Sequence, residues 1–389
     1  MNKWKYKTLD QMGSVQRGRS KHRPRNDARL FGGQYPFIQT ADVKNAPFYI
    51  SEYTETYNEM GLAQSKLWDI GTLCITIAAN IADTGILAIP ACFPDSVLGF
   101  RAYDDISDVR FVKYCFDILQ KDCKQISQGT AQDNLSWEKL STIKFPCPPI
   151  EVQRKIADVL SAYDDLIENN RKQIKLLEEA AQRLYKEWFI DLRFPGHENT
   201  PIIDGIPEGW RYGSITDIAV CFDGKRIPLS SSERSSQKKV YPYYGAAACM
   251  DYVEKYIFDG IYLLFGEDGT VITNDGSPVL QYVWGKFWVN NHAHIFQGIS
   301  PFTTEFLYML CKHLKVSDVV TGVAQPKISQ GRLNAKAILI PNNNLVIKYN
   351  KATDAIFRTI RNCTDQIKLL IESRDRLLPK LMTGELEVR

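Results

Sequence analysis

Apolar residues at seven-residue spacing mark one long segment near the middle of the chain. No proline or glycine interrupts residues 151–188, and Pro148-Pro149 before it and Pro195-Gly196 after it are typical of helix ends. The apolar positions form two interleaved heptad registers, which predicts a helix with a coiled-coil seam. We assign these residues of the helix to the seam: Ile156, Leu160, Ile167, Ile174, Leu177 and Leu184.

The chain is an internal duplication. Trp4-Lys5-Tyr6 matches Trp210-Arg211-Tyr212 at an offset of 206 residues, and the run Gln173–Leu177 recurs unchanged at 366–370, at an offset of 193. The drop of 13 residues between the two offsets indicates a variable stretch inside one half. The offset predicts a second long helix with a weaker copy of the seam at these residues: Ile356, Ile360, Ile367, Leu370 and Leu377.

Asn170 falls in the otherwise apolar seam of the first long helix. A polar residue at such a position can fix the register of a coiled coil at some cost in stability. Alternatively, Asn170 lies at a frayed or solvated stretch, and the sequence leaves both interpretations open.

Short strands are predicted ahead of each long helix. Runs such as 73–77 and 261–265 are rich in β-branched, aromatic and other apolar residues and are bounded by turn formers, with one helical pattern in each half at about 108–121 and 304–314. The predicted fold class is α+β, with two β-rich mixed domains separated by two long helices that form an antiparallel coiled coil, related by a pseudo-twofold repeat. The predicted boundaries are 1–148 and 205–343 for the domains, and 149–191 and 344–389 for the helices.

Composition narrows the class of protein. The first residues lack the apolar core of a secretory signal, and no apolar run is long enough to span a bilayer, so we expect a cytoplasmic protein without membrane contact. The nine cysteines include no Cys-x-x-Cys pair, which argues against zinc and redox motifs. A formal net charge of +3 is too small by itself to indicate a nucleic-acid partner.

Local clusters of cations carry that argument instead. One glycine-bounded, weakly apolar segment contains Arg17, Arg19, Lys21, His22, Arg23, Arg25 and Arg29, which are suited to phosphate contact or guanine recognition. The alternative is a solvated basic loop. Lys225 and Arg226 occupy the repeat-related place, with Lys238 and Lys239 after a serine-rich loop, and this recurrence favours DNA contact at two half-sites.

Two glutamines end a repeated Gly-x-Ala-Gln element. Gln132 and Gln325 can each pair with an adenine edge, or each can cap its own loop. Lys327, close to the second glutamine, is a further candidate for DNA contact.

Three other motifs do not indicate catalysis. Residues 13–20 resemble a phosphate-binding loop, but arginine replaces the essential lysine and Lys-His-Arg-Pro-Arg follows in place of a helix start. Residues 265–269 resemble a methyl-donor loop, yet the chain has no Asn-Pro-Pro-Tyr or Asp-Pro-Pro-Tyr tetrapeptide to hold a flipped adenine. His292 and His294 have no neighbouring cysteine or carboxylate cluster in the sequence, so we predict no metal site and no catalytic residue.

The long helix resembles a known family. Its residues Pro148–Ile156, Asp164–Asn170 and Leu184–Phe189 are closely similar to the central conserved region of type I restriction-modification specificity subunits. Pro207–Trp210 resembles the start of that family's second target-recognition domain. The second half departs from the pattern at Pro341–Leu345, which puts the docking at that end in doubt.

The resemblance implies a sequence-specific DNA-binding specificity subunit that recognises a bipartite, asymmetric site. It implies that two target-recognition domains are held apart by the helix pair, which acts as a ruler. The implied partners are double-stranded DNA, two modification (methyltransferase) subunits and two restriction (ATP-dependent translocase and nuclease) subunits. S-adenosylmethionine, ATP and Mg²⁺ are expected on those partners, and no cofactor is expected on this chain.

Two alternatives remain open from the sequence: a stand-alone DNA methyltransferase, or a pure coiled-coil scaffold protein. Specific DNA binding distinguishes the main hypothesis from both. The duplication also predicts that residues 1 to about 200 alone form a homodimer through the first long helix.

Overall fold

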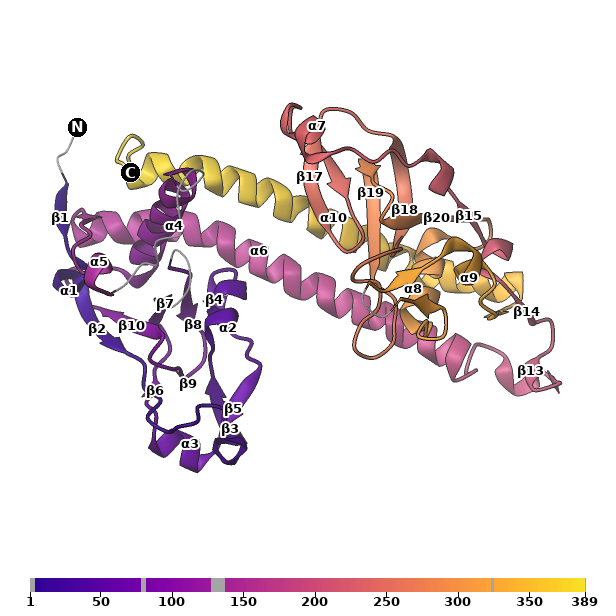
Figure 1. Cartoon of the computed structure of the whole chain (residues 1–389), viewed down its shortest axis with the longest axis horizontal. Coiled ribbons are helices and arrows are strands. Elements are labelled where there is room, and N and C mark those ends of the chain that lie inside the picture. The colour runs from indigo at the N-terminus through magenta and orange to yellow at the C-terminus, as the bar shows by residue number, and fades with distance from the viewer. Residues whose placement is uncertain (1–3, 78–81, 127–136, 323–324, 389) are drawn as a thin grey trace. The chain divides into compact units, whose positions relative to one another are not determined.

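The computed structural model describes residues 4–77, 82–126, 137–322 and 325–388. The chain divides into two compact units, Met1–Arg171 together with Asp365–Arg389, and Lys172–Thr364. Each unit contains one β-rich domain and a segment of both long helices (Figure 1).

The first domain is built on a five-stranded sheet in the order β2-β10-β7-β8-β4, a four-stranded sheet in the order β5-β3-β9-β6, and the antiparallel pair β1-β11. Its strands are β1 (Lys5–Lys7), β2 (Gly13–Arg17), β3 (Phe31–Phe37), β4 (Tyr49–Ile50), β5 (Glu55–Tyr57), β6 (Leu67–Trp68), β7 (Leu73–Thr76), β8 (Thr84–Leu87), β9 (Ala91–Cys92), β10 (Val97–Ala102) and β11 (Phe145–Cys147). Its helices are α1 (Leu9–Met12), η1 (Ala28–Leu30), α2 (Thr40–Asn45), α3 (Glu59–Ala63), α4 (Val109–Ile126) and α5 (Trp137–Leu140).

The second domain is built on a six-stranded sheet in the order β15-β20-β18-β19-β16-β17, with three two-stranded sheets, β12-β13, β14-β23 and β21-β22. Its strands are β12 (Ile202–Ile203), β13 (Ile206–Pro207), β14 (Arg211–Gly213), β15 (Ala219–Cys221), β16 (Tyr241–Tyr244), β17 (Cys249–Val253), β18 (Phe258–Gly266), β19 (Leu280–Val289), β20 (Ala293–Gly298), β21 (Val320–Thr321), β22 (Lys327–Ile328) and β23 (Ile338–Ile340). Its helices are η4 (His197–Asn199), η5 (Ile215–Asp217), η6 (Asp223–Lys225), α7 (Ser231–Ser235), α8 (Thr304–His313) and α9 (Gln330–Asn334).

The two domains share one topology. The order β2-β10-β7-β8 in the first corresponds to β15-β20-β18-β19 in the second, and in both a strand from earlier in the chain pairs in parallel with the last of these four (β4 with β8, β16 with β19). The predicted single helices are α4, which packs on β8, and α8, which packs on β18, β19 and β20 (Figure 1). The duplication inferred from the sequence is therefore also present in the strand order.

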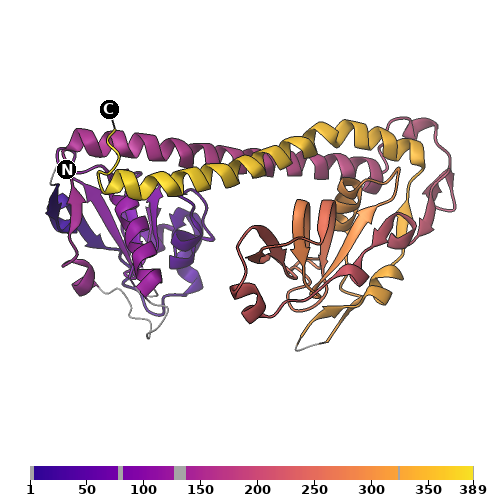
Figure 2. The same cartoon turned by 90° about the horizontal axis from the view of Figure 1, so that it is seen from above.

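Two long helices, α6 (Ile150–Tyr185) and α10 (Asn343–Met382), follow the domains, and a π-helical turn, η3 (Lys186–Ile190), extends α6. They lie side by side in Figures 1 and 2. In the first unit Asn170 donates a hydrogen bond to Gln366 and Arg374 donates one to Asp164. In the second the Tyr349 hydroxyl donates to the carbonyl of Ala181 and Cys363 donates to Gln173. In both units the residue numbers on one helix rise as those on the other fall, so the helices run antiparallel in each. These observations confirm the predicted α+β class with two β-rich domains and two long antiparallel helices.

The helix pairs close the hydrophobic core of each unit. In the first unit the predicted seam residues Ile156 and Leu160 are buried in the core that covers α4, and Leu377 packs against it. In the second unit Ile360 is buried, with four predicted residues partly buried against the same core: Ile174, Leu177, Leu184 and Ile356. Of the remaining predicted residues, Ile167 is buried, and Ile367 and Leu370 are half-buried. Within the described ranges, no helix combines the length and apolarity needed to cross a membrane.

Candidate nucleic-acid interface

The cationic segment of the first domain, residues 17–29, begins at the last residue of β2. Its backbone is fixed to the neighbouring loop, because Gly18 N donates to Val97 O at 2.8 Å and Arg19 N donates to Phe93 O at 3.0 Å. Gly13–Arg17 forms a strand here, so the segment does not have the loop-to-helix geometry of a phosphate-binding loop.

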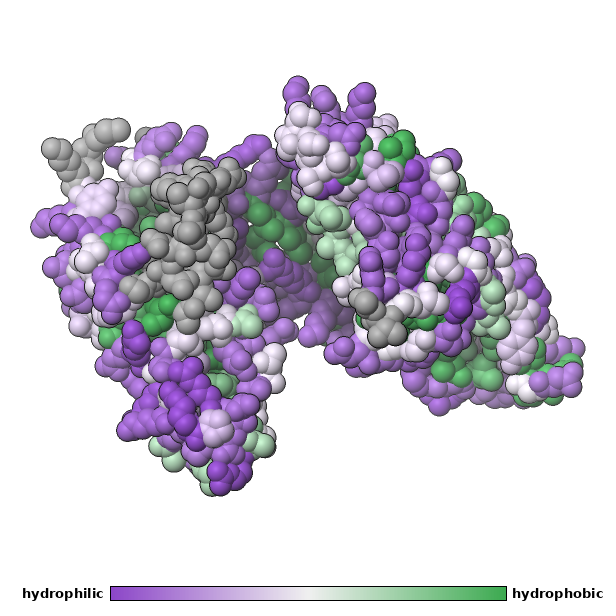
Figure 3. Space-filling view, in the orientation of Figure 1, coloured by the Kyte–Doolittle hydropathy of each residue, from purple (hydrophilic) through white to green (hydrophobic). Residues whose placement is uncertain are grey.

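Three cations of this segment are free to bind a ligand. Arg17, Arg19 and Lys21 are exposed, and their side chains make no hydrogen bond or ion pair with the residues that the structure describes. In the space-filling view of Figure 3, hydrophilic side chains gather over the end of this domain that carries α3. Unpaired, exposed cations on a fixed backbone are suited to contact phosphates.

The other arginines of the segment already have acidic partners. Arg25 donates two hydrogen bonds to Asp95, at 2.6 and 2.8 Å, and Arg23 lies 3.8 Å from the same carboxylate. Arg29 pairs with Asp27 at 2.6 Å, and its hydrogen bonds lower the pKa of that carboxyl. DNA contact by these three arginines would therefore compete with existing ion pairs.

In the second domain Glu267, at the end of β18, joins two candidate segments. Its carboxylate contacts Arg226 at 2.6 Å and Lys327 at 3.3 Å, and its carbonyl accepts from Ile328 N at 2.8 Å. Burial raises the pKa of Glu267. The hydrogen bond from Arg226 and the other nearby cations lower it by more, so the pKa of Glu267 is lowered overall. One carboxylate thus connects the turn after β15 with the hairpin β21-β22.

A buried histidine completes this network. Nδ1 of His294 lies 2.5 Å from Asp223, its Nε2 donates to Ile328 O at 2.8 Å, and its side chain is 1% exposed. Burial raises the pKa of Asp223, and the hydrogen bond with His294 is the largest of the opposing effects that leave it lowered. The sequence-based statement that no carboxylates accompany this histidine was wrong, because Asp223 and Glu267 reach it across the sheet.

The ligand atoms of Asp223, Glu267 and His294 lie within 4.8 Å of one another. Both ring nitrogens of His294 are engaged, and Arg226 and Lys327 already supply positive charge to the carboxylates. The arrangement is an internally compensated ion-pair network and carries no argument for a metal ion. The absence of a metal stays a prediction.

The remaining candidates near this network are exposed. Lys225 places its ammonium 5.2 Å from the centre of the Phe222 ring, and Gln325 lies on the surface beside the hairpin. The repeat-related Gln132 lies outside the described residues. The structure therefore brings Lys225, Arg226 and Lys327 to one place, although about 100 residues separate the first from the last.

Lys238 and Lys239 lie elsewhere in the second domain, between α7 and β16. Lys239 pairs with Asp251 at 2.8 Å, and Arg234, which sequence reasoning missed, pairs with the same carboxylate at 3.2 Å. Lys238 is exposed and has no side-chain partner within the described ranges.

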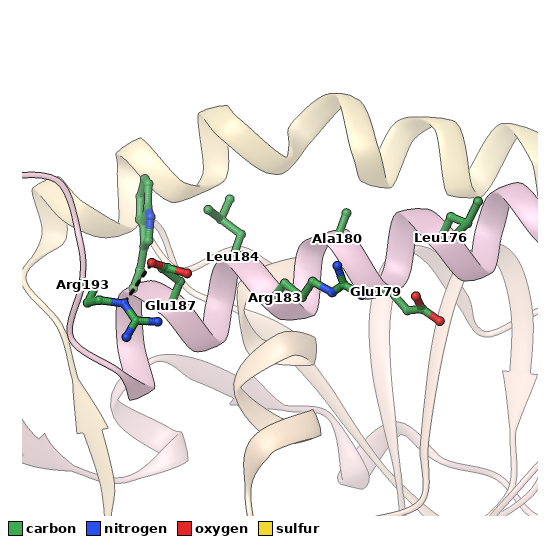
Figure 4. Close-up of a pocket in the computed structure, with 8 residues that line it drawn as sticks. Leu176, Glu179, Ala180, Arg183, Leu184, Glu187 and Arg193 are labelled. Carbon is green, nitrogen blue, oxygen red and sulfur yellow. Dashed lines mark hydrogen bonds and ion pairs between the residues drawn. The ribbon is translucent and has the colours of Figure 1, made fainter.

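A shallow groove runs along α6 in the second unit (Figure 4). Leu176 and Leu184 lie on it beside the charged Glu179 and Arg183, and Leu176 is 65% exposed. The same four residue types recur on α10, where Leu369 is 63% exposed. The repeated set on α10 is Leu369, Glu372, Arg376 and Leu377.

The fold and these surfaces define a protein of two repeated domains, each with exposed cations after the first strand of its main sheet. The chain belongs to the family of the type I restriction modification DNA specificity domain, whose model matches residues 1–179 and 207–368. The two matched stretches correspond to the two halves of the duplication.

Named relatives agree with this assignment. The type I restriction enzyme MjaIX specificity subunit of Methanocaldococcus jannaschii is 28% identical over 410 residues, covering 99% of this chain and 94% of the relative. The EcoprrI specificity subunit of Escherichia coli is 19% identical, covering 80% and 77%. The crystal structure of the type I restriction-modification S subunit from M. genitalium shares the fold, with a TM-score of 0.58 at 16% identity over 97% of this chain and 96% of that one.

Proposed function

We propose that this specificity subunit recognises a bipartite, asymmetric DNA site, with one half-site bound by each domain. The observation that carries the proposal is that exposed cations stand at the same place in both domains, directly after β2 and directly after β15. In the first domain these are Arg17 at the end of β2, Arg19 and Lys21. In the second domain Lys225 stands after β15, and Lys327 of β22 joins the same place through Glu267, which also binds Arg226. Such cations neutralise phosphates and orient a domain on the duplex.

The difference between the two surfaces supports an asymmetric site. Among the residues that the structure describes, the first domain presents three cations without a side-chain partner, whereas the second holds Arg226 and Lys327 around Glu267. Arg226 is only 14% exposed and is engaged with Glu267, so we assign it the role of positioning the loop and leave DNA contact to Lys225, Gln325 and Lys327. Gln132 keeps its role as a candidate from the sequence.

The proposal also makes this chain a scaffold without catalytic groups of its own. The repeat-related exposed leucines, Leu176 on α6 and Leu369 on α10, offer two equivalent surfaces, which suits two copies of one modification subunit. Restriction subunits would join that complex, and S-adenosylmethionine, ATP and Mg²⁺ would bind to the partners. Methyl transfer from labelled S-adenosylmethionine by the purified chain alone would contradict this view and favour a stand-alone methyltransferase.

The salt dependence of DNA binding tests the main proposal. The recognised site is first mapped as methylated adenines in cells that carry the chain and its partner subunits. In the assembled complex, replacing Arg17, Arg19 and Lys21 together by alanine should reduce the slope of log affinity against log salt by about 0.9 for each lost phosphate contact.

The same segment supplies a matched control. Arg23, Arg25 and Arg29 lie close by, but each faces a carboxylate, so their triple alanine variant should change the slope less. An unchanged slope in the first variant would show that the free cations form only a solvated surface, and the proposed interface would be wrong.

A further inference from the structure

A buried ion pair joins the two long helices in the first unit. Asp164 on α6 is 4% exposed; one of its oxygens accepts from the guanidinium of Arg374 on α10, and the other accepts from the Tyr114 hydroxyl at 2.5 Å. Burial raises the pKa of the Asp164 carboxyl, and Arg374 and Tyr114 oppose that shift. The charge on Asp164 therefore depends on a residue of the other helix.

The repeat-related position in the second unit carries no charge. The offset of 193 residues places Phe357 where the first unit has Asp164, and Ala181 where it has Arg374. Phe357 is 1% exposed and Ala181 is fully buried, and both belong to one hydrophobic core. A large and a small apolar side chain thus replace the ion pair at the second of two otherwise repeated positions.

A polar pair nearer the middle of the helices lacks this asymmetry. Asn170 donates to Gln366 at 3.2 Å in the first unit, and in the second the repeat-related Cys363 donates to Gln173 at 3.5 Å. Asn170 is buried and hydrogen-bonded, which favours the interpretation that it fixes the register and argues against a solvated position. Because both acceptors are glutamines, this pair would tolerate either helix as a partner.

We propose that the Asp164–Arg374 pair specifies which helices associate, so that α6 takes α10 and rejects the α6 of a second copy. In an antiparallel pair of two α6 helices, each Asp164 would face Ala181 of the other copy. In a pair of two α10 helices, each Arg374 would face Phe357. The pair of two α6 helices would bury two Asp164 carboxylates without a cation, which reverses the homodimer expected from the duplication alone. In the pair of two α10 helices each Arg374 would keep its contact with Asp375 at 3.0 Å but lose Asp164.

The size of the effect follows from the burial of the charges. Leaving one member of a buried ion pair unpaired weakens an association by about 100-fold or more, and the dimer of two α6 helices contains two such Asp164 positions. Replacing both members by apolar residues of suitable size is often neutral or stabilising. A chain with two apolar positions should therefore fold but lose the discrimination.

The full chain can be tested after one cut. A protease site is inserted between Glu198 and Asn199, which are exposed, and the folded protein is cleaved so that only non-covalent contacts, those of the helix pair among them, hold the halves together. Native mass spectrometry then follows the exchange of halves. Cleaved wild type should retain first-half with second-half complexes, with homodimers at least about 100-fold below their statistical share.

The decisive variant makes both positions alike through Asp164→Phe with Arg374→Ala. After cleavage, homodimers of the first half should rise toward their statistical share. Statistical homodimers from the wild type, or their absence from this variant after the same exchange, would overturn the proposal.

A reversed pair, Asp164→Arg with Arg374→Asp, keeps the test decisive even if the apolar variant does not fold. When cleaved wild type and the reversed variant are mixed, only halves with opposite charges should associate. Complexes between mismatched halves at the statistical share would likewise overturn the proposal.

Discussion

The substitution Gly18→Ala tests whether the backbone under the free cations is held as tightly as the structure indicates. A Cβ at this position would lie 2.3 Å from Pro94 O and 2.5 Å from Phe93 Cδ2. Phe93 cannot move aside easily, because it is fully buried and its ring stacks on Trp68 with centroids 4.7 Å apart. Moving the backbone would instead weaken the hydrogen bond from Gly18 N to Val97 O.

We therefore expect Gly18→Ala to lower the free energy of unfolding by about 1–3 kcal/mol, the usual cost of overpacking. It should also weaken DNA binding in the assembled complex, because Arg17 and Arg19 flank the displaced residue. Urea unfolding of the purified chain and binding at one fixed salt concentration measure the two effects.

Gly224→Ala is the matched control, since apart from its chain neighbours no described residue places an atom within 4 Å of a Cβ added at this repeat-related glycine. Its free energy of unfolding should stay within about 0.5 kcal/mol of the wild type. If the two variants unfold at the same urea concentration, the close contact at Gly18 does not restrain the segment, and the reasoning is refuted.

Three further predictions concern the ion pairs and the helices. Glu267→Gln should lower the free energy of unfolding, measured in urea, by about 1–3 kcal/mol near neutral pH. Because the pKa of Glu267 is lowered in the folded state, this loss is full above the ordinary pKa of a glutamate and shrinks as pH falls through the folded pKa. Arg374→Ala should lower the free energy of unfolding by about 3–5 kcal/mol near neutral pH, because it leaves Asp164 buried and charged without its cation. The pKa of Asp164 is raised in the folded state, so the carboxyl takes up a proton as pH falls, and unfolding at several pH values should show the lost stability returning. One heptad inserted after Gln173 in α6 and one at the matching place in α10 lengthen the helix pair by about 10 Å. The two half-sites, mapped as methylated adenines, should then lie about three base pairs further apart. An unchanged spacer between the half-sites would contradict the hypothesis that the helix pair acts as a ruler.

The elements with a strong local period were predictable. The heptads predicted residues 151–188 as one helix, and the structure has α6 over Ile150–Tyr185 with the π-helical turn after it. The offset of 193 residues then located α10 although its own seam is weaker. The duplication predicted the pairing of the helices because two copies of one half need complementary faces.

Contacts across the sheet were not predictable from one sequence. Asp223, Glu267 and His294 come from segments at β15, β18 and β20, and only the strand order brings them together. The four-stranded sheet β5-β3-β9-β6 lies mostly in the stretch where the repeat offset changes. Only Tyr35–Phe37 of β3 has a recognisable copy, at Tyr241–Tyr243 of β16, and because β16 belongs to the main sheet of the second domain, this copy did not reveal the separate sheet of the first. Local pattern carries no information about which distant strands become neighbours.

The two halves have kept one backbone while the charges on it have diverged. Arg19 of the first domain has no side-chain partner within the described ranges, whereas the second domain uses Arg226, next to the repeat-related Lys225, to hold two loops together through Glu267. Where α6 carries the buried Asp164, α10 carries Phe357. A fold tolerates such exchanges because the sheets and the seam depend on apolar packing, which does not require a particular charge at these positions. The exchange at Arg226 makes the two candidate DNA-binding surfaces different, and that difference is what the proposed asymmetric DNA site requires of a duplicated protein.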